Sequence, residues 1–239
     1  MKSILDILDL NKKKVLLRLD LNVPLKNGKI TDTARIDKIL PTINFLLKSN
    51  AKIIILSHVG RPKGKFVDEL RSEIKSYTGA QSAFLTTSAT TALSMALRAL
   101  NVKVGDEVIV SDFSFPATAN VVEEMGAIPI FADVSLETYN MLPSDLEKKI
   151  SNKTKAVIFV DALGNPSGIH EIKKLCEKYN LPLIEDAACA IGSSEFGVKC
   201  GNIADLTCFS FHPRKLLTTG EGGAITFNRK NFENFFETK

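Results

Sequence analysis

Short apolar runs alternate with amphipathic helical patterns along most of this chain, and polar residues cluster where the apolar runs end. Beyond residue 66, runs rich in Val, Ile, Phe and Ala predict buried strands at residues 83–86, 107–110, 127–131, 155–160, 181–184 and 206–209. Apolar positions at helical spacing predict helices at residues 67–77, 92–100, 116–124 and 168–179. Another helix is expected after Ser144, which has capping-box spacing to Glu147. This alternation predicts an α/β fold with a doubly wound, mostly parallel sheet.

The first 65 residues show the same alternation on a smaller scale. A strand at 15–19, a helix with its apolar face between residues 36 and 47, and a strand at 52–56 predict a right-handed parallel βαβ unit. This segment carries 14 Lys and Arg against 5 Asp and no Glu, whereas residues 66–239 carry 17 against 22 acidic residues. The change in charge predicts two domains, 1–65 and 66–239.

Composition narrows the class of protein. A hydrophobic content of 44% is enough for a buried core. The four cysteines (Cys176, Cys189, Cys200 and Cys208) lack C-x-x-C spacing and a nearby histidine pair, so free thiols and no metal site are predicted. The basic segment lacks interleaved aromatic residues, so no nucleic-acid partner is expected. No signal peptide or membrane span is recognised, which predicts a cytoplasmic protein.

Residues 209–223 (FSFHPRKLLTTGEGG) carry the strongest candidate chemistry. Lys215 follows a predicted strand, lies five residues after Ser210, and precedes a glycine-rich turn at 220–223. A lysine held in this way can present its amine to a carbonyl and form a Schiff base. A solvated loop lysine is the alternative interpretation.

Three other groups follow predicted strands, and the carboxyl ends of parallel strands share one edge of the sheet. Ser88, Ala89 and Thr90 open a helix, where free backbone amides favour a phosphate, although plain helix capping is the simpler alternative. Phe115 can stack on a planar ring, whereas Phe113 is expected in the core. Asp186 can hold a proton on a pyridine nitrogen, so that the ring accepts electrons from a carbanion. With Lys215 these groups predict one pyridoxal 5′-phosphate site.

These motifs resemble the large domain of the fold-type-I, pyridoxal-phosphate-dependent sugar-nucleotide aminotransferases of the DegT type. The matching stretches are residues 88–93 (SATTAL), 105–109 (GDEVI), 115–118 (FPAT), 185–188 (EDAA), 209–215 (FSFHPRK) and 220–223 (GEGG). The resemblance implies that Lys215 is the Schiff-base lysine and Asp186 the pyridinium partner. It also implies that Phe115 stacks on the ring, and that Ser210 and the Ser88 loop hold the phosphate. Cys189 stands where the family often has Gln or His bonding the phenolic oxygen of the cofactor.

The resemblance also implies an activity and partners. The expected reaction transfers an amino group, usually from glutamate, to a keto-sugar nucleotide in polysaccharide biosynthesis. The expected assembly is a homodimer, with the active site at the dimer interface. Relative to the family, the small domain that follows about residue 239 is expected to be missing, as is the segment that precedes residue 66.

The first segment resembles the opening of phosphoglycerate kinase, at residues 14–24 (KVLLRLDLNVP) and 57–64 (SHVGRPKG). By this resemblance Asp20, Asn22, Arg35, His58 and Arg61 form a 3-phosphoglycerate site. The match stops near residue 65, and no segment corresponds to the nucleotide domain of the kinase. The sequence thus predicts a junction of two fragments near residues 65–67. A phosphoglycerate-binding fragment and an inactive fusion product are the alternatives to an aminotransferase.

Overall fold

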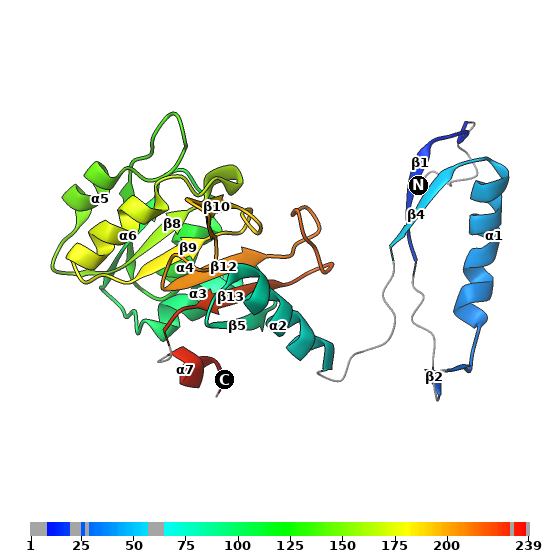
Figure 1. Cartoon of the computed structure of the whole chain (residues 1–239), viewed down its shortest axis with the longest axis horizontal. Helices are drawn as coiled ribbons and strands as arrows, with labels where there is room; N and C mark the ends of the chain where they lie inside the picture. The colour runs from blue at the N-terminus through cyan, green and yellow to red at the C-terminus, as the bar shows by residue number, and fades with distance from the viewer. Residues whose placement is uncertain (1–8, 20–24, 27–28, 57–64, 230–231, 238–239) are drawn as a thin grey trace. The chain divides into compact units, whose positions relative to one another are not determined.

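The computed structural model describes residues 9–19, 25–26, 29–56, 65–229 and 232–237. The chain divides into two compact units, residues 1–64 and residues 65–239 (Figure 1). Each unit is described by itself.

The second unit is built on a seven-stranded sheet with the order β5-β13-β12-β9-β8-β6-β7 (Figure 1). Its strands are β5 (Ser82–Thr86), β6 (Glu107–Ser111), β7 (Ile128–Ala132), β8 (Thr154–Val160), β9 (Leu183–Asp186), β12 (Leu206–Ser210) and β13 (Gly223–Phe227). All run parallel except β13, which pairs in antiparallel fashion with both β5 and β12. The predicted α/β fold with a mostly parallel sheet is confirmed.

Helices cover both faces of this sheet (Figure 1). Helices α3 (Ala89–Ala99) and α4 (Ala117–Glu124) pack on one face, together with α7 (Glu233–Glu237). On the other face lie α2 (Lys65–Thr78), α5 (Pro143–Lys149) and α6 (Ile169–Lys178). The strands show why both faces are covered, since neighbours such as Val108 and Ile109 point to opposite faces and both are fully buried.

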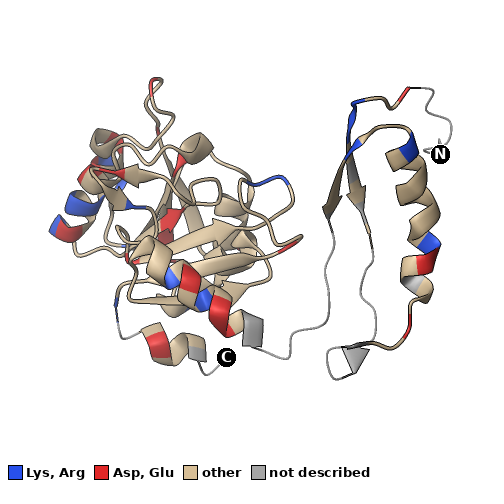
Figure 2. Cartoon of the chain, turned by 45° about the vertical axis from the view of Figure 1, so that its right-hand side comes forward, with Lys and Arg blue, Asp and Glu red and all other residues tan. Residues whose placement is uncertain are grey.

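Charged residues of this unit lie mainly on helices and loops, and most of the sheet lacks them (Figure 2). Strand β9 is an exception, because Glu185 and Asp186 end it and both are buried. The four cysteines are free thiols, as predicted, and Cys176 lies on the buried face of α6. Among the described helices, none is long and apolar enough to cross a membrane.

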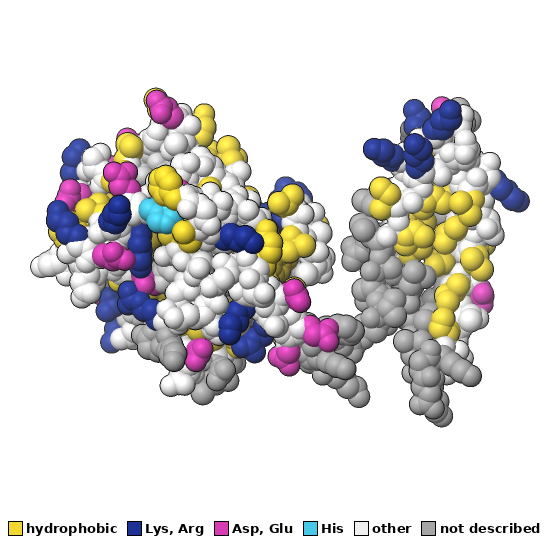
Figure 3. Space-filling model, viewed as in Figure 1, with side chains coloured by type: hydrophobic (Ala, Val, Ile, Leu, Met, Phe, Trp, Pro, Cys, Tyr) yellow, Lys and Arg dark blue, Asp and Glu magenta, His cyan; other side chains and the backbone are white. Residues whose placement is uncertain are grey.

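In the first unit, β1 (Lys14–Arg18) pairs in parallel with β4 (Lys52–Leu56), and α1 (Ala34–Lys48) connects them, as the sequence predicts. Strands β2 (Leu25–Lys26) and β3 (Lys29–Ile30) form a short antiparallel pair. Apolar side chains gather on one face of this unit (Figure 3). The exposed apolar residues of this unit include Ile54, Ile55 and Leu47.

Several expectations were wrong. The helix expected after Ser144 begins at Pro143 with Leu142 as its N-cap, and no side chain caps it. Proline at the first helical position explains the earlier start, because its missing N–H needs no partner there. Phe113 is 45% exposed and packs on Tyr139 instead of entering the core. The strand patterns also missed β13 and the hairpin of β10 (Ser194–Glu195) and β11 (Val198–Lys199).

That hairpin caps helix α6. The N-cap residue Gly168 has no side chain, and Glu195 instead accepts hydrogen bonds from the backbone N–H groups of Gly168 and His170. The His170 imidazole Nδ1 lies 2.7 Å from the same carboxylate. Burial opposes ionisation of Glu195, but these hydrogen bonds and the imidazole outweigh it and lower its pKa.

Replacing Glu195 with Gln is expected to destabilise the chain in a pH-dependent way. Because the pKa of Glu195 is lowered in the folded state, the ionised carboxylate stabilises the fold at pH values above its pKa in the unfolded chain, which is about 4.3. This contribution is lost as the pH falls through the pKa of the folded state. We expect the variant to lose about 1–3 kcal/mol of unfolding free energy at pH 7, and less below about pH 4. Urea unfolding across this range measures the effect. Glu171→Gln, an exposed change in the same helical turn, is the control. A loss that is equal at all pH values would contradict the role of the charge.

Candidate active site

The predicted site residues of the second unit gather at one edge of its sheet. Strands β5, β6, β9 and β12 run in the same direction, so their carboxyl ends share this edge. Ser88 follows β5, Phe115 follows β6, Asp186 ends β9 and Ser210 ends β12. The sequence-based expectation that these groups share one edge therefore agrees with the strand directions.

Gly223 lies between Ser210 and the segment that leads from β5 through Ser88 to α3. It pairs with Thr86 of β5 on one side and with Ser210 of β12 on the other. A Cβ atom on this glycine would lie 2.6 Å from the carbonyl carbon of Ser88 and 2.8 Å from the backbone nitrogen of Ala89. Only glycine allows strand β13 to approach the start of helix α3 this closely.

The start of α3 has the features of an anion site. The Ser88 hydroxyl accepts a hydrogen bond of 3.1 Å from the backbone N–H of Thr91, and Thr86 Oγ1 donates to the Ser88 carbonyl oxygen at 2.8 Å. These bonds fix the loop before the helix. The first turn of a helix leaves backbone N–H groups without helical partners, and the helix dipole favours a negative charge beside them. Ala89 is half-buried and Thr90 is exposed, so this end of the helix is open to a ligand.

Asp186 is a buried carboxylate held by two donors. Thr118 Oγ1 of helix α4 donates to its Oδ2 at 2.8 Å, and the backbone N–H of Ala188 donates to its Oδ1 at 3.2 Å. Burial raises its pKa, while these donors and the charge of Lys215 act in the opposite direction. Ser114 also bonds to Thr118, at 2.6 Å between the hydroxyls, so the loop that carries Phe115 is tied to Asp186. Sequence reasoning missed Thr118, although its hydroxyl in the first turn after Pro116 was a usable signal.

Lys215 and Cys189 lie in contact. The Lys215 Nζ donates to the Cys189 Sγ at 3.0 Å, and its charge acts on Asp186. Cys189 is exposed and Lys215 is half-buried, so the amine can be reached from solvent. The Phe115 ring is 73% exposed, which leaves it free to stack on a flat ligand.

The structure does not test the five residues predicted to bind 3-phosphoglycerate. Asp20, Asn22, His58 and Arg61 lie outside the described residues. Arg35 lies on α1, and its side chain is likewise outside the described part of the structure. The 3-phosphoglycerate site therefore stays a prediction.

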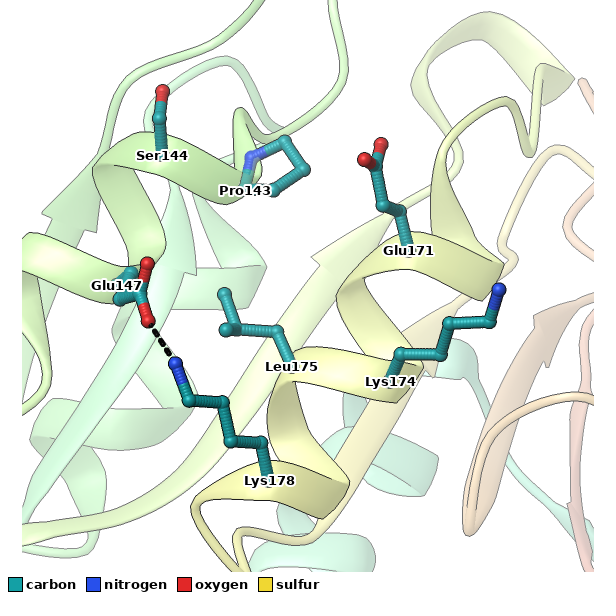
Figure 4. Close-up of a pocket in the computed structure, with 7 residues that line it drawn as sticks. All are labelled: Pro143, Ser144, Glu147, Glu171, Lys174, Leu175 and Lys178. Carbon is teal, nitrogen blue, oxygen red and sulfur yellow. Dashed lines mark hydrogen bonds and ion pairs between the residues drawn. The ribbon is translucent and has the colours of Figure 1, made fainter.

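A pocket of about 280 Å³ lies elsewhere, between α5 and α6 (Figure 4). It is lined by Pro143, Ser144, Glu147, Glu171, Lys174, Leu175 and Lys178. The Glu147 carboxylate already accepts hydrogen bonds from Lys178 and Tyr179. None of the predicted site residues lines this pocket, so it is not the candidate active site.

Several solved structures similar to this chain are described as aminotransferases. The aminotransferase from Psychrobacter cryohalolentis is 32% identical, with a TM-score of 0.70 over 84% of this chain and 49% of that one. PseC of Helicobacter pylori, an aminotransferase involved in the biosynthesis of pseudoaminic acid, is 32% identical with a TM-score of 0.69, over 73% of this chain and 47% of that one. The fold and site thus define the class of fold-type-I, pyridoxal-phosphate-dependent aminotransferases. Residues 49–237 match the DegT/DnrJ/EryC1/StrS aminotransferase family, and the chain belongs to it.

Curated relatives agree with this assignment. GDP-perosamine synthase of Vibrio cholerae is 37% identical over 166 residues, which are 70% of this chain and 45% of that protein. UDP-2-acetamido-2-deoxy-3-oxo-D-glucuronate aminotransferase of Pseudomonas aeruginosa is 38% identical over 175 residues, 73% of this chain and 49% of that protein. The chain spans about half the length of the curated relatives it matches.

These findings confirm the predicted family and its cofactor, pyridoxal phosphate; one similar structure, from Streptococcus pneumoniae, was solved in a PLP form. The family match starts at residue 49, before the boundary predicted near residue 66. The relatives described above give the kinase alternative no support. The kinase resemblance and the junction of two fragments remain untested predictions.

Proposed function

We propose that this chain is a pyridoxal-phosphate-dependent aminotransferase that transfers an amino group from glutamate to a keto-sugar nucleotide. The observation that carries the proposal is the arrangement of Asp186, Lys215 and the start of α3 at one edge of the sheet. The names of the relatives, which include GDP-perosamine synthase and a UDP-sugar aminotransferase, support a nucleotide-linked sugar as the substrate.

The residues present fit the cofactor. Asp186 is a buried carboxylate whose pKa is raised by desolvation, and a protonated ring nitrogen beside it would add a positive charge that favours its ionised form. The first turn of α3 and the hydroxyls of Ser88 and Ser210 would hold the phosphate, and Phe115 would cover the ring. When bound, pyridoxal phosphate supplies an electrophilic carbonyl and an electron sink.

The chain's own residues then have distinct tasks. Lys215 Nζ anchors the cofactor. It also removes the proton from the amino-bearing carbon of the donor and delivers a proton to the carbon of the acceptor that receives the amino group. Asp186 holds the proton at the ring nitrogen, and Thr118 orients the Asp186 carboxylate through their 2.8 Å hydrogen bond. Cys189 is a weaker hydrogen-bond donor than Gln or His toward a phenolic oxygen, so we propose that its role is secondary.

We also propose a domain arrangement, an oligomeric state and a cellular location for the chain. Residues 66–239 supply the cofactor-binding large domain of a cytoplasmic homodimer, and residues 1–65 form a separate unit. Leu216, next to Lys215, is 86% exposed, and it lines an apolar pocket of about 400 Å³ with Leu70, Tyr77 and Leu217. Such a surface beside the site supports contact with a second copy. A solution mass of a single 26.2 kDa chain would oppose the dimer.

The transfer reaction can be tested with the full chain, pyridoxal phosphate and glutamate. We expect an absorbance band that reports the bound cofactor, and glutamate should change this band and release 2-oxoglutarate. A keto-sugar nucleotide should then restore the band. Binding of the cofactor without release of 2-oxoglutarate would refute the glutamate donor. Failure of every amino donor to change the band would refute the aminotransferase proposal itself.

A further inference from the structure

Three potential metal ligands meet in the interior of the second unit. Asp161 follows β8, Glu185 lies on β9, and Cys200 follows β11. Their exposed fractions are 2%, 0% and 1%. One ligand atom from each, two carboxylate oxygens and the Cys200 sulfur, lie within 4.8 Å of one another.

Most of the oxygen atoms in this group have no hydrogen-bond partner outside the group among the described residues. Both carboxylate oxygens of Asp161 and the Oε1 of Glu185 are buried, and hydrogen bonding within the group is confined to the two acids and the Cys200 thiol. Only Glu185 Oε2 is satisfied from outside the group, by the backbone N–H of Gly201 at 3.0 Å and by Thr207 Oγ1 at 2.6 Å. Buried polar groups in folded proteins are nearly always paired, so two buried acids whose remaining oxygens meet only each other and a thiol require an explanation.

Another buried carboxylate in the same unit, Asp205, has the cationic partners that Asp161 and Glu185 lack within the described part of the chain. Asp205 is 3% exposed, and its Oδ1 lies 3.0 Å from Lys173 Nζ and 2.7 Å from an Arg229 nitrogen. Its other oxygen accepts a hydrogen bond from the backbone N–H of Leu183 at 2.8 Å. No ion pair among the described residues involves Asp161 or Glu185. The fold thus compensates one buried acid fully and leaves two adjacent acids without a cation.

This cluster is separate from the proposed cofactor site. Glu185 and Asp186 are consecutive on β9, so their side chains point to opposite faces of the sheet. Asp186 bonds to Thr118 of α4, whereas Glu185 bonds to Thr207 and to the segment after β11. A group bound by Glu185 would therefore lie on the opposite face of the sheet from Asp186 and would not occupy the proposed cofactor site.

We propose that Asp161, Glu185 and Cys200 bind a divalent transition-metal ion of the zinc class. A thiolate with two carboxylates is a mixed sulfur and oxygen set that zinc accepts, while calcium and magnesium prefer oxygen ligands alone. The Cys200 thiol loses its proton to water as the metal–sulfur bond forms, so binding releases a proton. The ion supplies the positive charge that the two carboxylates lack. It also links the end of β8, strand β9 and the segment after β11 beneath the Asp186 edge of the sheet.

The test uses the purified full chain, stripped with a chelator and then loaded with Zn²⁺ or Co²⁺. We expect about one tightly held ion per chain, and a sulfur-to-cobalt charge-transfer band in the near ultraviolet for the Co²⁺ form. X-ray absorption of the zinc form should show one sulfur neighbour at about 2.3 Å and oxygen neighbours at about 2.0–2.2 Å. This measurement needs no variant, so it does not depend on whether a substituted chain folds.

Variants locate the site. Cys200→Ser and Asp161→Asn should lose the bound ion, and Cys200→Ser should also lose the charge-transfer band. Cys189→Ser is the matched control, because Cys189 is an exposed thiol beside Lys215 and should leave both readouts unchanged. A band that survives in Cys200→Ser but disappears in Cys189→Ser would overturn the assignment. So would a chain that binds neither Zn²⁺ nor Co²⁺; a buried protonated carboxyl, seen as an infrared carbonyl stretch that Asp161→Asn removes, would then account for the cluster.

Discussion

Replacing Lys215 with alanine is expected to abolish covalent retention of pyridoxal phosphate and the transfer of amino groups. The amine is the group that bonds to the carbonyl of the cofactor, and it moves the proton at the substrate carbon. Loss of the proton transfer alone should reduce the rate by about 10²–10⁴-fold. The measurement is the absorbance of the bound cofactor before and after borohydride treatment, followed by mass spectrometry of the peptide that contains Lys215.

The matched control is Lys174→Ala, which removes an exposed lysine from α6, near the pocket between α5 and α6. This variant should keep the absorbance, the borohydride-fixed mass and the activity of the original chain. We expect alanine at position 215 to leave the fold intact, since the Lys215 side chain is only half-buried and contacts the exposed Cys189. A cofactor that stays attached in Lys215→Ala would show that another amine carries it.

Replacing Gly223 with alanine is expected to damage the fold and the phosphate site together. The new Cβ would lie 2.6 Å from the carbonyl carbon of Ser88, 2.7 Å from the carbonyl oxygen of Phe209 and 2.8 Å from the nitrogen of Ala89. All three are backbone atoms, so no side-chain rotation relieves the contact. We expect a loss of about 1–3 kcal/mol or more in unfolding free energy, and weaker binding of pyridoxal phosphate. Urea unfolding and a cofactor titration measure the two effects.

Gly220→Ala separates crowding from backbone strain. Gly220 lies three residues before Gly223, in the turn that leads into β13, at φ +87°, and a Cβ there would meet no atom within 4 Å. Its substitution should cost about 1–2 kcal/mol through strain alone and leave cofactor affinity nearly unchanged. If Gly223→Ala bound the cofactor as well as Gly220→Ala does, the close approach of β13 to α3 would not matter for the site.

Periodicity was enough to predict the layers and the edge of the sheet where the candidate site residues lie. Parallel strands bring Ser88, Asp186 and Ser210 together because the polar residue that follows each strand reaches the same edge. Short local motifs were less reliable predictors of helix starts and of single buried residues. The capping-box spacing at Ser144 was overridden by Pro143, and Phe113 lies on the surface against Tyr139.

Contacts between distant segments could not be predicted from one sequence. Thr118 and Asp186 are 68 positions apart, and Glu195 caps a helix 25 positions away from it. The sequence predicts no metal site because the cysteines lack short spacings and a nearby histidine pair, whereas Asp161, Glu185 and Cys200 come from three separate segments. Such groups become neighbours only through tertiary structure, which leaves no local spacing to recognise.

The antiparallel strand β13 sets the order in which this unit can be completed during synthesis. Strand β5 lies at one edge of the sheet, and its partner β13 comes more than a hundred residues later in the chain. A nascent chain on the ribosome therefore holds β5 and the Ser88 loop unpaired until residue 227 has emerged, and closing so long a loop is slow. The proposed phosphate site would then be among the last features to form, and a newly made chain would acquire affinity for pyridoxal phosphate only when its sheet is complete.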